Sequence, residues 1–158
     1  MSTTSHPWKQ HLLRQAEALD KLRGSKRWAE PTAIKLEESV VLGFYAIRRL
    51  IGGFLLSEAA VHRPIAVTAY PARRPAGTVR LGDEDLETLY DLAAGRMASH
   101  DLSFLCHQVL HNCALAPQFG PEHELTGILV TSDHQRKVAL YGLSLDALVA
   151  LFRGIGEG

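Results

Sequence analysis

Two histidines four residues apart, His107 and His111, are the side chains with the clearest chemical potential in this chain. The segment 102–113 has the apolar periodicity of a helix, so we expect both rings on one face about one turn apart. Gln108 and Asn112 flank them as candidate binding residues. Two imidazoles on a polar face can bind a metal, transfer protons or contact a phosphate. They can equally face solvent without any role.

A metal site at this pair would need further ligands. The candidates nearby in sequence are His100, Asp101, His123 and His134. In zinc proteases the His-x-x-x-His pattern has a glutamate directly after the first histidine as general base. Gln108 holds that position here and cannot accept a proton, so the sequence excludes that class. A metal site stays a weaker alternative to proton chemistry, and we expect neither a metal nor another cofactor.

Two adjacent arginines in the predicted second helix are candidate cations. Arg48 and Arg49 can present a guanidinium to a phosphate or a carboxylate, with Tyr45 beside them as a candidate binding residue. We therefore count both arginines with His107 and His111 as candidate catalytic residues. The alternative is a solvated arginine, which could also pair with Glu37 or Glu38 on the same helix.

Length and composition indicate one globular domain over residues 1–158. Apolar residues make up 46% and charged residues 22% of the chain, and a chain of this size buries a substantial core without disulfides. Lys plus Arg and Asp plus Glu number 17 each, so the formal net charge is zero. This balance excludes nucleic-acid binding by bulk charge but leaves a local basic patch open. It also offers little repulsion against self-association.

The cysteines and the hydropathy pattern indicate in which cellular compartment the protein works. Cys106 and Cys113 are expected on one apolar helix face, about 10 Å apart and beyond disulfide reach. They are therefore expected to be buried thiols in a reducing compartment. The N-terminus has no apolar signal region, and the longest apolar stretch, 40–56, contains two arginines, as a core helix does. We expect a cytoplasmic protein outside the membrane.

Periodicity and turn residues predict a mixed order of helices and strands. Helices are expected at 8–23, from 31 to beyond 51, at 83–94, at 102–113 and after Ser144, and strands at 65–70, 125–131 and 137–142. The last two strands are expected to form a hairpin. Polar residues are common in such turns because they suit the turn backbone, so those between the two strands need no functional explanation. The order predicts an α+β fold: a helical hairpin (8–60), a strand with helices (64–115) and a hairpin plus helix (124–155). Long antiparallel helices would pack on a sheet of about three strands.

The helices 36–56 and 102–113 resemble the paired helices of the HEPN superfamily, the higher eukaryote and prokaryote nucleotide-binding domains. The family motif is an arginine, usually a polar residue, and a histidine four to six residues on. His107 matches the polar position and His111 the closing histidine, while Cys106 stands where the family has arginine. Many family members are metal-independent endoribonucleases of bacterial defence or stress systems.

The resemblance implies roles for the candidate residues. His111 would be the general acid or base at the RNA 2′-hydroxyl. Arg48 or Arg49 would supply the missing cation to the transition state, in a site formed across a two-fold dimer. Because the motif arginine is absent, an inactive relative is implied as readily as a nuclease. The chain also resembles bacterial proteins of no assigned function, which share its Cys-x-x-x-x-His helix and its segment 43–48.

The alternative is a non-enzymatic module that forms homo-oligomers or binds a protein partner. Its helices would form the interface, with Phe44 and Ile47 as the residues whose replacement by a charge breaks the assembly. The histidines would then be incidental. RNA and protein therefore both stay open as partners.

Overall fold

The computed structural model describes residues 6–73 and 86–158. The elements in chain order are α1 (Pro7–Leu22), α2 (Glu30–Gly52), α3 (Glu58–His62), β1 (Ile65–Pro71), α4 (Leu86–Leu89), β2 (Arg96–His100), α5 (Leu102–Leu110), β3 (Asn112–Phe119), β4 (Leu125–Ser132), β5 (Ala139–Ser144) and α6 (Leu145–Glu157). The fold is mixed α+β, as the sequence predicts.

The strands form one antiparallel sheet of five strands in the order β2-β1-β5-β4-β3. The predicted hairpin is confirmed as β4 and β5, and the predicted strand at 65–70 is β1. The expectation of about three strands is too low, because β2 and β3 were not predicted. Both lie at the edges of the sheet, where strands are short or irregular and carry weak sequence signals.

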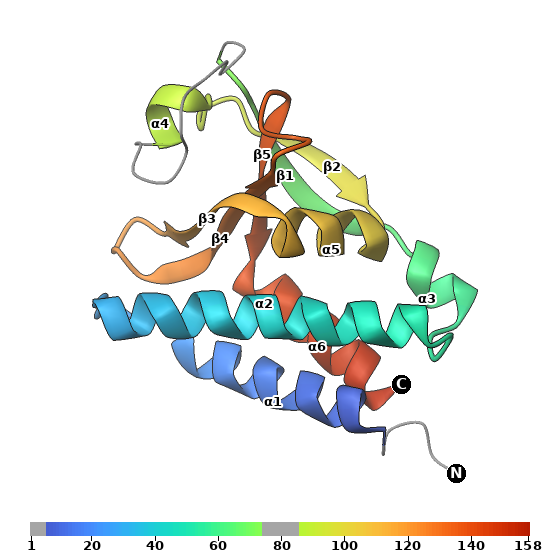
Figure 1. Cartoon of the computed structure of the whole chain (residues 1–158). Helices are drawn as coiled ribbons and strands as arrows, with labels where there is room; N and C mark the ends of the chain where they lie inside the picture. Colours follow the sequence, from blue (N-terminus) through green and yellow to red (C-terminus); the bar gives the residue numbers. More distant parts are fainter. Residues whose placement is uncertain (1–5, 74–85) are drawn as a thin grey trace.

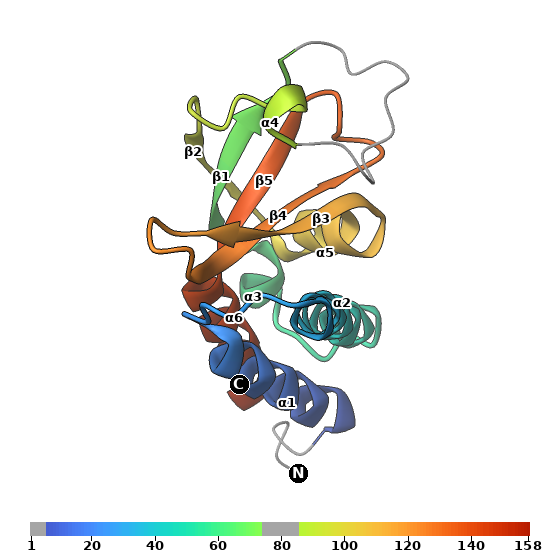
Figure 2. The same cartoon turned by 90° about the vertical axis from the view of Figure 1, so that its left-hand side faces the viewer.

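Helices cover one face of the sheet in layers (Figure 1). Helix α5 lies against this face, α2 packs on α5, and α1 packs on α2 and α6. Figure 2 shows the sheet above and these helices stacked below it. The main core lies between the layers and includes Val130 and Tyr141 from the sheet, Leu105 from α5, and Phe44 from α2. The helical half therefore holds α5 in place, and with it both histidines of the predicted pair.

A smaller apolar cluster covers the opposite face of the sheet. It consists of Tyr90, Ala114, Leu129 and Leu140. The Tyr90 hydroxyl donates to the main-chain oxygen of Arg136 at 2.7 Å, so the chain after α4 is fixed to the β4–β5 turn. The predicted helix at 83–94 is wrong for most of its length, since only 86–89 is helical and positions 83–85 lie outside the described residues.

The long helices begin and end where local signals predict. His6 and Ser144 cap α1 and α6 by accepting hydrogen bonds from main-chain N–H groups. Helix α2 ends at Gly52, and the segment 54–60 does not continue it, because α3 begins separately. None of the helices described is both long and apolar enough to cross a membrane.

The expected interface on α2 is instead an internal contact. Phe44 and Ile47 are fully buried within the single chain, in the core between the helices. A charge at either position would therefore disrupt the monomer itself. The prediction that Phe44 and Ile47 form an oligomer interface is wrong.

Gly43 allows α2 and α6 to pack closely. A methyl group at this position would overlap the ring carbons of Phe152, which is fully buried and packs edge-on against Phe44. We expect Gly43→Ala to lower the free energy of unfolding by about 1–3 kcal/mol through overpacking. Gly52→Ala, where a methyl group would meet no atom within 4 Å, should leave it unchanged or raise it slightly. Urea unfolding measures both, and equal stability of the two variants would contradict this packing.

Candidate functional site

The end of α5 positions the two histidines. Asp101 caps the helix by accepting from the Phe104 N–H at 2.9 Å. The helix ends at Leu110, so the prediction that it continues to residue 113 is wrong. His111 is the C-cap, and its N–H donates to the main-chain oxygen of His107 at 3.0 Å. The tight end of the helix thus keeps the two histidines adjacent.

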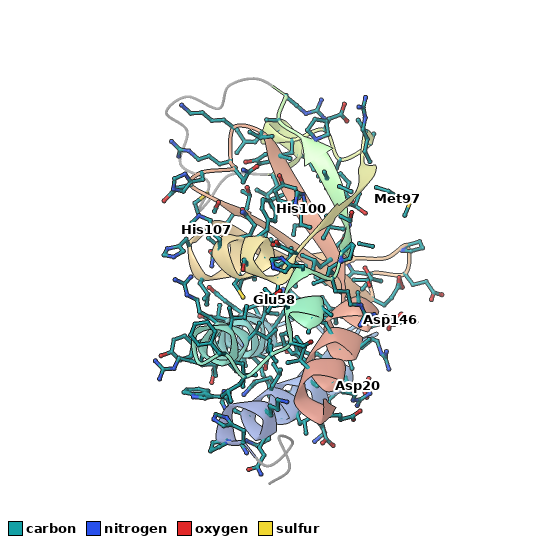
Figure 3. All side chains as sticks on the ribbon, turned by 90° about the vertical axis from the view of Figure 1, so that its right-hand side faces the viewer. Asp20, Glu58, Met97, His100, His107 and Asp146 are labelled. Atoms are coloured by element: carbon teal, nitrogen blue, oxygen red, sulfur yellow. The ribbon has the colours of Figure 1, made fainter. Side chains whose placement is uncertain are left out.

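Three imidazole rings meet at this end of the helix. The ring centroids of His107 and His111 lie 4.8 Å apart, and those of His107 and His134 lie 5.2 Å apart. His134 comes from the β4–β5 turn. Figure 3 shows His107 on the outer surface of α5. We call His107, His111 and His134 the histidine cluster.

The β4–β5 turn is held against α5 by Gln108. Its side-chain Oε1 accepts from the main-chain N–H of Ser132 at 3.0 Å, and the residue is only 1% exposed. Asn112 has a similar local role, because its Nδ2 donates to the Val109 oxygen at 2.8 Å. The structure thus places Gln108 and Asn112, two of the three candidate binding residues, in the framework that supports the cluster.

Charge at the cluster is set by its own members and by α2. Burial, followed by the neighbouring His111 and His134 rings and the Arg48 guanidinium, lowers the pKa of His107 below 6.5. His107 is therefore neutral at neutral pH and can accept a proton. Arg48 is exposed, and within the described residues no carboxylate lies within 4.0 Å of it. Among the described residues Arg48 therefore forms no ion pair along α2, and its exposure agrees with the alternative of a solvated arginine.

Arg49 and Tyr45 lie with Trp8 of α1. The Arg49 guanidinium carbon lies 5.6 Å from the centroid of the Trp8 ring, a cation–π distance. The Tyr45 ring meets Trp8 edge-on with centroids 5.5 Å apart. The charge of Arg48 thus acts on His107, whereas Arg49 makes a different contact with Trp8.

The other candidate ligands are occupied elsewhere. The His100 ring stacks on Phe104 at 3.7 Å, and burial lowers its pKa. The His123 ring stacks on Phe119 at 4.4 Å. In the part of the chain that the structure describes, no three His, Cys, Asp or Glu side chains are arranged to hold a metal ion.

Both cysteines are free thiols. Cys106 is buried with its Sγ directed at the Phe44 oxygen of α2 at 3.7 Å, and burial raises its pKa to about 12. Cys113 lies in β3 and is half-buried, so the expectation of two buried thiols on one helix face is wrong. At the position of the family arginine, this chain has an inert thiol.

The sequence names His134 only as a possible metal ligand and does not count it among the catalytic or binding residues. Polar residues in its turn have a sufficient backbone explanation. Only the packing of α5 against β4 brings the turn to the helix end. No protein-family model, curated protein or solved structure matches the chain, so the site rests on its own geometry.

The coupling within the histidine cluster can be measured by NMR titration. We expect the His107 ring to titrate below pH 6.5, and we expect its pKa to rise in His134→Gln, because a neighbouring positive charge is removed. His62→Gln on α3 serves as the control and should leave the His107 titration unchanged. A His107 pKa that does not respond to His134→Gln would contradict the cluster.

Proposed function

We propose that this protein is a HEPN-like, metal-independent endoribonuclease of a bacterial defence or stress system, with its reaction at the histidine cluster. The observation that carries the proposal is the meeting of three imidazoles, of which His107 has a lowered pKa and feels the charge of Arg48. The free thiols suit a cytoplasmic protein. An inactive relative that binds RNA without cleaving it is the nearest variant of this proposal.

RNA cleavage without a metal needs one proton acceptor and one proton donor. His107, whose pKa is lowered, would take the proton from a ribose 2′-hydroxyl, the position at which the resemblance alone would place His111. The 2′-oxygen would then bond to the adjacent phosphorus while the bond from phosphorus to the 5′-oxygen breaks. His111 would act as the general acid and give a proton to the leaving 5′-oxygen. The products would be a 2′,3′-cyclic phosphate and a 5′-hydroxyl.

The developing charge on the phosphate needs a cation. Arg48 is exposed on α2, and its charge acts on His107, so it can face the same phosphate. Guanidinium groups pair with phosphate oxygens through two parallel hydrogen bonds. In this proposal Arg48 takes the role of the family's missing arginine, and His134 holds the substrate or supplies a second proton.

The decisive experiment is cleavage of single-stranded RNA in excess chelator. We expect cleavage with cyclic-phosphate ends, and we expect His107→Gln and His111→Gln to reduce the rate by about 100-fold or more. The acidic limb of the pH–rate profile should lie below pH 6.5, since the base must be neutral and its pKa is lowered.

His62→Gln is the matched control and should cleave like the unchanged protein. RNA binding without cleavage in any protein preparation would indicate the inactive relative. Cleavage that continues in both cluster variants would mean a contaminant or another site, and would end the proposal.

A second candidate function is that of a non-enzymatic module that assembles through the edge of its sheet. Strand β2 is an edge strand, and its Met97 is 90% exposed and points away from the molecule (Figure 3). Unpaired main-chain groups and an exposed apolar side chain at a sheet edge can pair with a second copy.

Sedimentation velocity tests this second candidate. If β2 pairs with a second copy, the protein sediments as a dimer, and Met97→Lys shifts it toward the monomer by placing like charges at the edge. Val138→Lys, at an exposed apolar residue outside the strands, should leave the dimer intact. A monomer at all concentrations would exclude homo-oligomerisation through β2.

A further inference from the structure

An exposed aromatic side chain on α2 lies beside a half-buried one on α1. Tyr45 is 43% exposed, whereas its sequence neighbours Phe44 and Ala46 are fully buried. Trp8, in the first turn of α1, packs partly on the core and meets the Tyr45 ring at an interplanar angle of 77°. Two packed helices therefore hold the Tyr45 ring in a fixed position with part of its apolar surface in water. Another flat ring can stack on such a surface.

Two arginines accompany these rings on α2. Arg48 and Arg49 follow Tyr45 by three and four residues, so all three side chains leave neighbouring positions of the helix surface. Over residues 6–73 and 86–158, no side-chain carboxylate lies within 4.0 Å of either guanidinium. Arg49 lies over the Trp8 ring, but a cation–π contact does not neutralise a guanidinium, so Arg49 can still pair with a phosphate. The surface thus combines an exposed ring with positive charge.

The same face of the molecule carries the histidine cluster. Helices α5, α2 and α1 lie one below another on the face turned to the viewer in Figure 1, and each packs on the next. Figure 3, seen from the right-hand side of Figure 1, shows His107 projecting from that face. The charge of Arg48 acts on His107. Two helix spacings, roughly 16–20 Å, separate α5 from α1, so a short run of nucleotides could span the face.

We infer that Trp8, Tyr45 and Arg49, which we call the aromatic strip, bind an unpaired base of the RNA next to the histidine cluster. The base stacks on the Tyr45 ring, and the phosphates on either side of it pair with Arg48 and Arg49. The substrate class is therefore single-stranded RNA, because a base inside a duplex has no free face for a protein ring. The inference rests on the proposed function, from which it takes RNA as the ligand.

Fluorescence anisotropy with a labelled, 2′-O-methylated single-stranded oligonucleotide tests the inference. This probe lacks the free 2′-hydroxyl, so binding is measured without cleavage. We expect Tyr45→Leu to weaken binding about tenfold, the loss of one base–aromatic stack. Tyr45→Phe keeps the ring and should bind like the unchanged protein. An abasic oligonucleotide of the same length and charge should bind the unchanged protein about tenfold more weakly, and Tyr45→Leu should weaken it no further.

The salt dependence of binding tests the contribution of Arg49. Loss of one phosphate contact to a single strand should reduce the slope of log affinity against log salt concentration by about 0.7. We expect that reduction in Arg49→Gln. Arg27→Gln, at an exposed arginine before the opposite end of α2, is the matched charge control and should keep the slope of the unchanged protein.

The outcomes separate the aromatic strip from the nuclease. Equal binding of the base-bearing and abasic probes by the unchanged protein, or tighter binding of duplex RNA, would overturn the inference even if cleavage occurs. Binding that depends on Tyr45, in a protein that does not cleave natural RNA, would uphold the aromatic strip and end the nuclease proposal. A glutamate-rich peptide that displaces the probe and loses affinity in Tyr45→Leu, while the abasic probe binds as well as the base-bearing one, would assign this face to an acidic protein partner instead.

Discussion

The hydrogen bond from the Ser132 N–H to Gln108 Oε1 is the contact on which the candidate site depends. It ties the last turn of α5 to the end of β4, and both residues are buried. An unpaired buried donor or acceptor would cost about 1–3 kcal/mol, so the helix end and the turn stay together. His134 follows Ser132 by two residues and is thereby held beside His107. Gln108, the residue that excludes the zinc-protease motif, therefore holds the histidine cluster together.

The second constraint is the early end of α5. Asn112 donates from its side chain to the Val109 oxygen, a local bond of the kind that competes with helical pairing. The chain then turns directly into β3. Because His111 is the C-cap, its ring stays close to His107 even though it no longer lies in the helix. The predicted proximity is correct, but its cause is a helix end rather than a helical repeat.

The parts of the fold that the sequence predicts have local causes. Helices α1, α2 and α6 have continuous apolar faces and clear start signals, and the β4–β5 hairpin has a polar turn between two apolar runs. The missed strands lack such signals. Strand β2 contains Arg96, Ser99 and His100 among five residues, and β3 contains Pro117, which an edge strand tolerates. Their strand structure follows from pairing with distant neighbours, which local periodicity does not report.

Local periodicity likewise limits how much of the candidate site the sequence predicts. Helical spacing is enough to pair His107 with His111, but Arg48 and Arg49 differ by one residue and only tertiary packing separates their surroundings. Arg49 turns to Trp8, whereas the charge of Arg48 acts on both His107 and Cys106. The buried Cys106 also lies against the backbone of α2, so an arginine there would have to bury its charge in the core. In this fold the arginine whose charge acts on His107 comes from a neighbouring element, because α2 packs against α5.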